Sequence, residues 1–472
     1  MQLFSLSVCA VLVFAGCSDP LRHRPTTVAG VYENGSRPLG LRSEPNEYGH
    51  RDKSVPVLGS DASPDDYVRH ALLSSPELEA AYQRWRAQSE RIVQVGALPD
   101  PRLSVGFFAN EVETRVGAQQ ARIGISQQFP WLEQLRARED AAAARARAAW
   151  IDYLRIELSL STRVISAMYE LHYLDQSIAV TGENLGLLRS FEDSVRARYR
   201  VGTGSHPDLV RTQVELGQLE DRLSQLETSR PAMVARLNAM LDRPHDAPIV
   251  INGDLTPPVI DEPLGEMIAR AEQVNPQLLA ISELVEEQRS LTEAARFAGR
   301  PELTVGVETI LTNNAINPSI PESGDDPLML SFSINLPIWR DKYDAGVRES
   351  IANRLALSSS REHARNELSA MLSGAHFDYT DAQRRGLLYE GSLIPKAYES
   401  LQSTLGAYRT GTSGFTDLLD AERTLLEFRL ASARARADRG IAAARLRELI
   451  GLTESSSELT NETQSIPSEG NE

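Results

Sequence analysis

An internal duplication constrains the fold of this 472-residue chain more than any other feature of its sequence. The segment 76–78, Pro-Glu-Leu, recurs at 276–278 as Pro-Gln-Leu, and 101–106, Pro-Arg-Leu-Ser-Val-Gly, recurs at 301–306 as Pro-Glu-Leu-Thr-Val-Gly. Phe-Pro-Trp at 129–131 then pairs with Leu-Pro-Ile-Trp at 336–339, so the second copy has gained residues, which we place in the loop-like segment 312–327. A unit used twice predicts a fold with two equivalent halves.

The duplication continues into the second part of each unit. Tyr-Arg-Val-Gly-Thr at 199–203 pairs with Tyr-Arg-Thr-Gly-Thr at 408–412, and Asp208 pairs with Asp417. Each unit is therefore predicted to contain a helix, two strands, a long helix, a tight turn and a return helix. Gly202 and Gly411 lie in the turns, where a helix pair that reverses direction needs a residue tolerant of positive φ.

The predicted boundaries follow from this pattern. A signal peptide covers 1–16, a lipid-anchored tether 17–63, the first repeat 64–241, a linker 242–263, the second repeat 264–452 and a disordered tail 453–472. In the first repeat we expect strands at about 101–112 and 119–129, a long helix at 132–199, a tip turn at 200–206 and a return helix at 207–241. In the second we expect strands at about 301–311 and 328–337, a long helix at 341–409, a tip turn at 410–414 and a return helix at 415–450.

The predicted strands alternate apolar with polar or small side chains, as Leu103, Val105 and Phe107 do in the first of them. One chain offers about four such strands, whereas the smallest closed membrane barrels need about eight and lipid tolerates no open sheet edge. Several copies of the chain must then share one barrel. The alternative is a pair of soluble hairpins packed on helices.

The long helices are rod-like in their composition. No proline occurs between Leu132 and Tyr199, which permits one helix of roughly 100 Å at about 1.5 Å per residue. Apolar residues from Ile151 to Val195 recur at spacings of three and four, so one stripe of the helix is buried against neighbouring helices. Pro395 interrupts the equivalent segment of the second repeat and predicts a kink or local irregularity.

The amino terminus resembles a bacterial lipoprotein signal. A short apolar run ends in Phe14-Ala15-Gly16-Cys17, which predicts lipidation of Cys17 and removal of everything before it, including Cys9. An ordinary signal peptide with an incidental cysteine is the alternative. Because the mature chain would keep a single, lipidated cysteine, no disulfide is expected.

Charge and residue patterns exclude several classes of protein. A formal net charge of −16 argues against a nucleic-acid partner, because phosphate binding needs a concentrated cationic surface. The eight histidines are scattered singly, with no His-Glu-x-x-His and no Cys-x-x-Cys. We therefore predict no enzyme, no catalytic residue, no metal site and no cofactor.

Taken together, the residues resemble the TolC-type outer-membrane efflux proteins over roughly 64–452. The resemblance rests on the duplication, on the proline-led strand pairs, on Gln-Gln-Phe-Pro-Trp at 127–131 entering a long helix, and on the Tyr-Arg-x-Gly-Thr turns followed by Asp-Leu. It implies a mainly α fold with a transmembrane part: a homotrimer with a twelve-stranded barrel and a periplasmic α-helical tunnel. It also implies a periplasmic adaptor protein and an inner-membrane pump as partners, and the Gln-Phe-Pro-Trp entry is similar to members that serve heavy-metal cation exporters.

The resemblance places function at the helical tips. Asp417 and Asp420 lie on one face at the start of the last helix, so threefold symmetry would stack them into two carboxylate rings that form a channel gate, with Asp208 as the first-repeat equivalent. The alternative is that they cap the helix and complement its dipole. A gate-locking arginine of the family is replaced here by Ser413, which leaves other arginines as counter-charges. The residues expected to contact the adaptor are Gly202, Thr203, Gly411 and Thr412, and the candidate counter-charges are Arg211 and Arg409.

The sequence thus predicts a lipid-anchored outer-membrane channel subunit that passively conducts metal cations or small toxic compounds to the outside. Trp131 and Trp339, where strands leave the bilayer, suit an interfacial aromatic belt or packing at the strand-to-helix junction. The competing hypothesis is a non-conducting, lipid-anchored coiled-coil scaffold of the envelope, which predicts no alternating strands.

Overall fold

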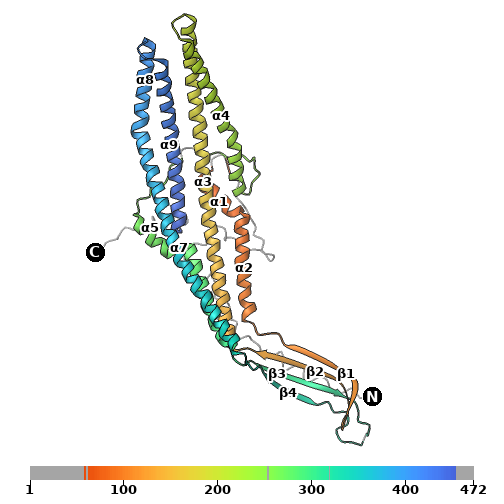
Figure 1. Cartoon of the computed structure of the whole chain (residues 1–472). Helices are drawn as coiled ribbons and strands as arrows, with labels where there is room; N and C mark the ends of the chain where they lie inside the picture. Colours follow the sequence, from red (N-terminus) through yellow and green to blue (C-terminus); the bar gives the residue numbers. More distant parts are fainter. Residues whose placement is uncertain (1–57, 60–61, 252–254, 318, 453–472) are drawn as a thin grey trace, which may run out of the picture. The chain divides into compact units, whose positions relative to one another are not determined.

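The computed structural model describes residues 58–59, 62–251, 255–317 and 319–452 (Figure 1). The chain divides into two compact units, which we call unit 1 and unit 2. Unit 1 contains Gln83–Trp150 and Ala280–Arg361; unit 2 contains Ile151–Leu279 and the described parts of Arg37–Tyr82 and Glu362–Glu472. Each unit draws on both sequence repeats, so the halves of the duplication are intertwined.

Unit 1 contains a four-stranded antiparallel sheet in the order β1-β2-β3-β4. Its strands are β1 (Arg102–Thr114), β2 (Gly117–Phe129), β3 (Leu303–Thr312) and β4 (Leu328–Ile334). The central pair, β2 with β3, joins the two sequence repeats along ten register partners that end at Phe129 opposite Leu303. Gly117, which opens β2, has a φ of 136°, and a side chain there would collide with the backbone of Asn313.

The observed ends of the strands differ slightly from the ends predicted from the sequence. β4 ends at Ile334 and not at Pro337, and Leu336 lies beyond the ladder. The reason is local: the side-chain oxygen of Asn335 accepts the backbone N–H of Glu302, and Pro337 has no N–H to donate to a ladder. The segment 313–327 lies between β3 and β4 and contains turns but no helix or strand in the residues described there.

The helices of unit 1 are parts of longer elements: α2 (Pro76–Gly96), α3 (Leu132–Arg200), α6 (Pro276–Ala298) and α7 (Arg340–Leu388). Within the unit, the rings of Trp85 and Trp150 lie 4.9 Å apart between α2 and α3. Arg147 Nε donates to Glu283 Oε2 at 2.8 Å between α3 and α6. Aromatic packing therefore connects two helices of the first repeat, and an ion pair connects the first repeat to the second.

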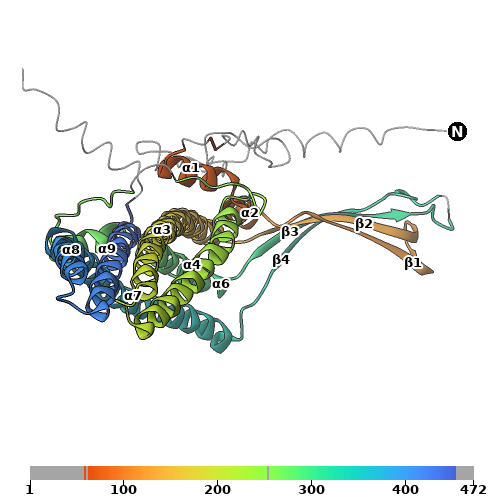
Figure 2. The same ribbon diagram turned by 90° about the horizontal axis from the view of Figure 1, so that it is seen from above.

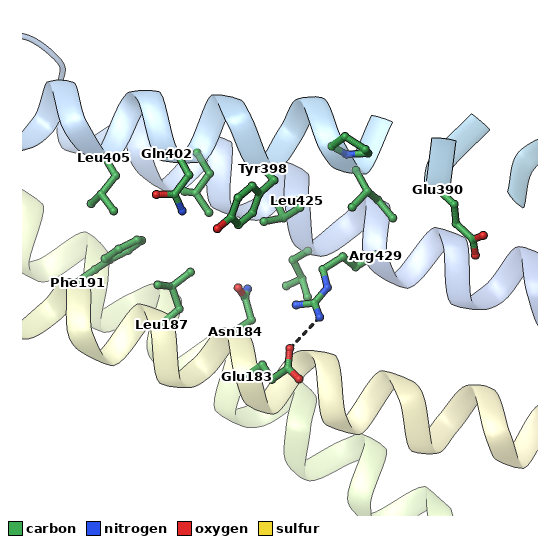
Figure 3. Close-up of a pocket in the computed structure, with 14 residues that line it drawn as sticks. Glu183, Asn184, Leu187, Phe191, Glu390, Tyr398, Gln402, Leu405, Leu425 and Arg429 are labelled. Carbon is green, nitrogen blue, oxygen red and sulfur yellow. Dashed lines mark hydrogen bonds and ion pairs between the residues drawn. The ribbon is translucent and has the colours of Figure 1, made fainter. Parts of the chain in front are cut away.

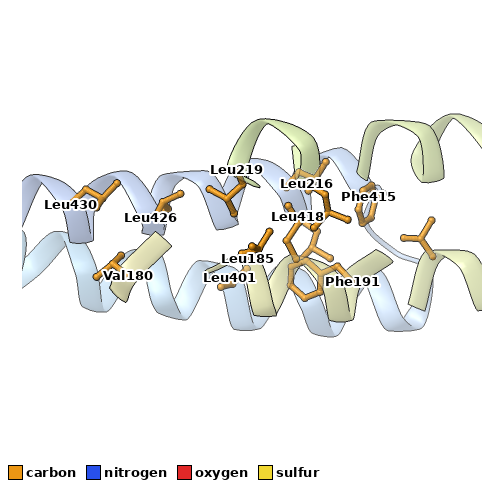
Figure 4. Close-up of a cluster of buried hydrophobic side chains, with 13 residues drawn as sticks. Val180, Leu185, Phe191, Leu216, Leu219, Leu401, Phe415, Leu418, Leu426 and Leu430 are labelled. Carbon is orange, nitrogen blue, oxygen red and sulfur yellow. The ribbon is translucent and has the colours of Figure 1, made fainter. Parts of the chain in front are cut away.

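Unit 2 is helical. It contains α1 (Pro64–Ser74), α4 (His206–Met240), α5 (Leu264–Val274), η3 (Tyr389–Leu393), α8 (Ile394–Thr410) and α9 (Phe415–Ile450), together with the remainders of α2, α3 and α7. The hairpin of α3 and α4 lies beside the hairpin of α8 and α9 in two views (Figures 1 and 2). A buried apolar cluster between them includes Leu188, Phe191, Leu401 and Leu418 (Figure 4). The apolar stripe on α3 thus buries itself against helices of both repeats.

The irregularity predicted near Pro395 is a π-helical turn. η3 spans Tyr389–Leu393 and precedes α8, whose second residue is Pro395. Proline has no N–H and its ring crowds the carbonyl four residues earlier, so the wider turn accommodates it without breaking the rod. In the first repeat a proline interrupts a different helix, since Pro231 lies inside the return helix α4.

Candidate functional site: an amphipathic open sheet and two helical turns

One face of the sheet is apolar across all four strands. The register aligns Leu103 on β1 with Ile125 on β2, and Ile125 with Val307 on β3, which in turn pairs with Leu330 on β4. These side chains are exposed to solvent in the single chain. Exposure of large apolar side chains is most pronounced at the edge strands, where Phe107 is 81% and Phe332 69% exposed. Such an exposed apolar face indicates a surface that contacts an apolar environment.

The same exposed apolar face accounts for the alternation seen in the sequence. Its other members include Val105, Ile123, Phe129, Leu303, Leu328 and Ile334.

The opposite face is polar and built from small residues. Ser104, Gly124 and Glu308 follow one another across β1, β2 and β3. A side chain at Gly124 would meet the Cβ of Glu308 and the hydroxyl of Ser104, so this face is compact. Arg122 forms a bidentate ion pair with Glu308, with Nε to Oε2 at 2.7 Å and Nη2 to Oε1 at 2.5 Å. The sheet is therefore amphipathic, with a charged pair in the middle of its polar face.

Both edges of this sheet lack a strand partner among the described residues, since β1 pairs with β2 alone and β4 with β3 alone. Free backbone N–H and C=O groups along two edges, next to an exposed apolar face, cannot be left unsatisfied in a bilayer. The sheet is complete only when other strands meet its edges.

The two helical turns of unit 2 have the geometry predicted from their glycines. Gly202 follows α3 with a φ of 76° and Gly411 follows α8 with a φ of 82°, both left-handed. The backbone N–H of Thr203 donates to Arg198 O at 2.9 Å, and that of Thr412 donates to Ala407 O at 2.9 Å. These bonds return to the last helical turn and close it, which is how a glycine-terminated helix ends.

The predicted gate carboxylates differ in their local roles. Asp417 accepts the backbone N–H of Gly414 at 3.0 Å and the hydroxyl of Ser413 at 2.8 Å, so it caps the start of α9 within one protomer. Asp420, one turn further, is exposed, and its Oδ1 lies 3.9 Å from Arg423 Nη1. Asp208 lies in the first turn of α4 and is half-buried. The capping alternative thus describes Asp417 in the single chain, while Asp420 presents a carboxylate to solvent.

Arginines connect the two hairpins near these turns. Arg198 Nη2 donates to the carbonyl of Arg409 at 2.9 Å, and its guanidinium lies 4.6 Å from the centre of the Tyr408 ring. Arg211 Nη1 donates to Thr416 Oγ1 at 2.7 Å. The sequence suggested Arg211 and Arg409 as counter-charges. In the structure the Arg211 side chain donates to a hydroxyl, and Arg409 accepts a hydrogen bond through its backbone carbonyl. Sequence reasoning missed Arg198, for which no pattern gave a signal.

A buried carboxyl group links the same hairpins. Glu422 of α9 is 2% exposed and accepts a hydrogen bond from the side-chain amide of Asn184 on α3. Burial raises the pKa of Glu422 to about 7; the Asn184 hydrogen bond lowers it, Glu215 raises it and Arg423 lowers it. Arg423 is itself paired with Glu215 on α4. The sequence contained a signal for this buried carboxyl, because Glu422 lies at helical spacing between the apolar residues Leu418 and Leu426.

Beside this link lies a groove of about 590 Å³ between α3, α8 and α9 (Figure 3). Its wall is mostly apolar, with Leu187 and Phe191 from α3 facing Leu405 from α8. Arg429 Nη2 bridges to Glu183 Oε2 at 2.8 Å across it. The groove lies between the two hairpins, beside the polar contacts that join them.

Within the part of the chain that the structure describes, no group of three or more His, Cys, Asp or Glu side chains could hold a metal ion. The described helices include none that is long and apolar enough to cross a membrane. Cys17, the predicted signal peptide, the tail and all of the tether except residues 58–59 and 62–63 lie outside the described residues.

Comparison with known proteins gives a consistent result. The sequence model of the outer membrane efflux protein family matches residues 67–243 and 267–452, one segment for each repeat. The cobalt-zinc-cadmium resistance protein CzcC of Cupriavidus metallidurans is 21% identical over 393 residues, covering 80% of this chain and 88% of that protein. The outer-membrane channel OprN superposes with a TM-score of 0.71 at 18% identity, over 85% of this chain and 93% of OprN. The outer membrane protein VceC of Vibrio cholerae superposes with a TM-score of 0.69 at 17% identity, over 82% and 96%.

An amphipathic sheet with free edges and paired helical hairpins is the fold of the outer-membrane channels on which this chain superposes over most of its length. The chain belongs to the outer membrane efflux protein family. This confirms the TolC-like fold class predicted from the duplication, and with it the efflux function. The scaffold hypothesis predicted no alternating strands, and the four-stranded sheet contradicts it.

Proposed function

We propose that three copies of this chain close one twelve-stranded barrel through which substrates leave the cell. The observation that carries the proposal is the four-stranded sheet with one apolar face, one polar face and two free edges. Pairing β1 of one copy with β4 of the next satisfies both edges, turns the apolar face to lipid and lines a water-filled interior with the polar face.

The gate of this duct is formed by the turn regions of unit 2. Threefold repetition places Asp420 in a ring of exposed carboxylates, which attracts cations and repels anions. Asp417 sets the start of α9 through its cap and so positions that ring, and Asp208 contributes the equivalent position of the first repeat. Replacing Asp420 by Asn should raise conductance and weaken cation selectivity, whereas Asp417→Asn, which keeps a capping oxygen, should do so less.

The same turns contact a periplasmic adaptor protein that connects the duct to an inner-membrane pump. Gly202, Thr203, Gly411 and Thr412 are exposed there, and their backbone conformation is fixed by the left-handed glycines. A rigid, exposed helical end suits docking because little conformational freedom is lost on binding.

The substrates are metal cations or small toxic compounds delivered by the pump, and the duct conducts them passively without an enzymatic step. Similarity to a cobalt-zinc-cadmium resistance protein supports the metal class. Lipidation of Cys17 would anchor the mature amino terminus in the outer membrane. This anchor would act together with the barrel in attaching the protein to the membrane.

Cysteine cross-linking between the two sheet edges tests the shared barrel. Ser104→Cys on β1 is combined with Ser331→Cys or Ser333→Cys on β4, all on the polar face, and the protein is oxidised in outer membranes. Because each copy carries both edges, the double variants should give covalent trimers and no larger species, and the purified trimer should conduct in planar bilayers.

The single variants are the matched controls. Dimers from Ser104→Cys alone would mean that like edges pair with each other, and cross-linking of neither double variant would mean that the edges do not meet. Either result, or a trimer that carries no current, would contradict the duct.

A further inference from the structure

Aromatic and cationic side chains gather in unit 1 where the strands meet the helices. We define the junction collar as Trp131, Arg300, Trp339, Arg340 and Lys342. Trp131 lies two residues beyond β2, and Arg300 lies shortly before β3. Trp339 follows β4, and Arg340 and Lys342 belong to the first turn of α7. All three cations thus lie in a segment that joins a helix to a strand or in the first turn of the helix that follows one.

Arg300 lies over two aromatic rings. Its guanidinium carbon is 4.4 Å from the centre of the Phe297 ring and 5.3 Å from that of Trp131. The indole Nε1 of Trp131 donates to Pro301 O at 2.8 Å, which fixes the ring beside the cation. Contact with a ring does not use the N–H groups of a guanidinium as hydrogen-bond donors, so they can still donate to an anion.

The second part of the collar adjoins the first. A side chain at Gly299 would place its Cβ 3.3 Å from the Cβ of Tyr343, so the backbone before Arg300 packs directly on the first turn of α7. Lys342 Nζ lies 5.5 Å from the centre of the Tyr343 ring. Trp339 is 73% exposed, and the side chains of Arg340 and Lys342 are exposed beside it.

The charge of the collar depends on whether its cations are paired. Several arginines of unit 1 are matched to carboxylates, as Arg122 is to Glu308 and Arg147 to Glu283. Among the residues that the structure describes, Arg300, Arg340 and Lys342 form no ion pair. Asp341 and Asp344 lie beside Arg340 and Lys342 at the start of α7, so the three collar cations against these two carboxylates leave a small net positive charge.

We propose that the junction collar binds the phosphate of anionic phospholipid headgroups at the membrane surface. The inference rests on the proposed barrel, because the collar adjoins the apolar face only if that face contacts lipid. Two observations favour a lipid over a free phosphate. The exposed apolar side chains of Leu336 and Ile338 continue the apolar face into the collar, and its tryptophans have the amphipathic shape that prefers the bilayer interface. Each cation near an anionic surface strengthens binding about fivefold.

Quenching of tryptophan fluorescence by brominated lipid tests the collar in the assembled protein. The trimer is reconstituted into phosphatidylcholine vesicles that contain equal fractions of brominated phosphatidylglycerol or of brominated phosphatidylcholine. Trp131 and Trp339 belong to the collar, whereas Trp85 and Trp150 pack against each other between helices and report the background. Brominated phosphatidylglycerol should quench more strongly, and added salt should reduce the difference.

Arg300→Gln and Lys342→Gln should each lower the relative binding constant for phosphatidylglycerol about fivefold. Arg222→Gln, an exposed arginine of α4 in unit 2, is the matched control and should change nothing. Equal quenching by the two lipids, or a preference that survives in the Arg300→Gln, Lys342→Gln double variant, would overturn headgroup binding while bilayer conductance still supports the duct. Absence of quenching by either lipid would remove the collar from the membrane surface. Headgroup preference without conductance would count against the duct alone.

Discussion

Replacing Glu422 by Gln should make the protein more stable at neutral and alkaline pH and leave it nearly unchanged in acid. Glu422 is 2% exposed and its hydrogen-bond partner is the Asn184 amide. Gln has nearly the same shape and keeps an oxygen that accepts from Asn184, but it cannot ionise. The substitution therefore removes the cost of a buried charge and little else.

The size of the effect follows from the pKa. Burial raises the pKa of Glu422 from its ordinary 4.5 to about 7. A carboxyl whose folded pKa is raised stabilises the packed state below the ordinary pKa, and this contribution is lost as pH rises from about 4.5 to about 7. At 1.36 kcal/mol per pKa unit the loss is about 3 kcal/mol at pH 8. For a chain of this length that corresponds to roughly 4 °C in melting temperature.

Thermal unfolding of the detergent-solubilised trimer, followed by far-ultraviolet circular dichroism between pH 4.5 and pH 8, measures this difference. The melting temperature of Glu422→Gln minus that of the wild type should be near zero at the acid end and grow to roughly 4 °C at pH 8. Glu427→Gln removes an exposed carboxylate from the same helix and is the matched control. It should give a small difference that changes little over this range.

A constant offset between Glu422→Gln and the wild type at every pH would refute the reasoning, because it would trace the effect to packing and not to ionisation. A variant that is less stable than the wild type at pH 8 would show that the charged carboxylate is well solvated or paired in place.

Two further predictions concern the turn and the sheet. Gly411→Ala should destabilise the protein by about 1–2 kcal/mol, because a side chain is strained at a φ of 82° even where open space surrounds it. Gly406 lies inside α8, the helix that ends before Gly411, and is equally open. Gly406→Ala should therefore stabilise the protein slightly in the same melting assay. Arg122→Gln should raise the cation-to-anion permeability ratio of the channel by roughly two- to threefold in reversal-potential measurements, because it leaves the Glu308 carboxylate unpaired on the polar face, and Glu308→Gln should lower it.

Much of the fold could be predicted from the sequence because the duplication checks itself. An element seen once by its periodicity is an inference, but the same pattern at 101–106 and 301–306 doubles the support for a strand that starts after a proline. Gly202 and Gly411 were predictable for a physical reason, since only glycine takes the left-handed conformation at little cost.

The contacts that join the repeats could not be predicted in this way. Arg122 and Glu308 meet only because β2 pairs with β3 in one register, and nothing in either strand specifies that register by itself. Arg198 reaches the carbonyl of Arg409, and a backbone acceptor leaves no trace in the sequence. Asp417 was open to two interpretations because a carboxylate at the start of a helix serves both a cap and a ring.

The polar contacts that join the two hairpins of unit 2 are made by different residues in the two sequence repeats. The first hairpin supplies Arg198 to the second, while the second supplies Arg423 and Arg429 to Glu215 and Glu183 of the first. The Arg429–Glu183 pair is exposed and contributes at most about 1 kcal/mol, whereas the side chain of Glu215 is only 14% exposed beside Arg423.

Glu422 differs from these contacts because it is buried, and its charge state changes near neutral pH. Ionisation of this buried link as pH rises through about 7 would weaken the packing of the two hairpins on each other. In the duct that we propose, a marginal buried link between two long helical hairpins would let the turn region stay closed and still open on docking.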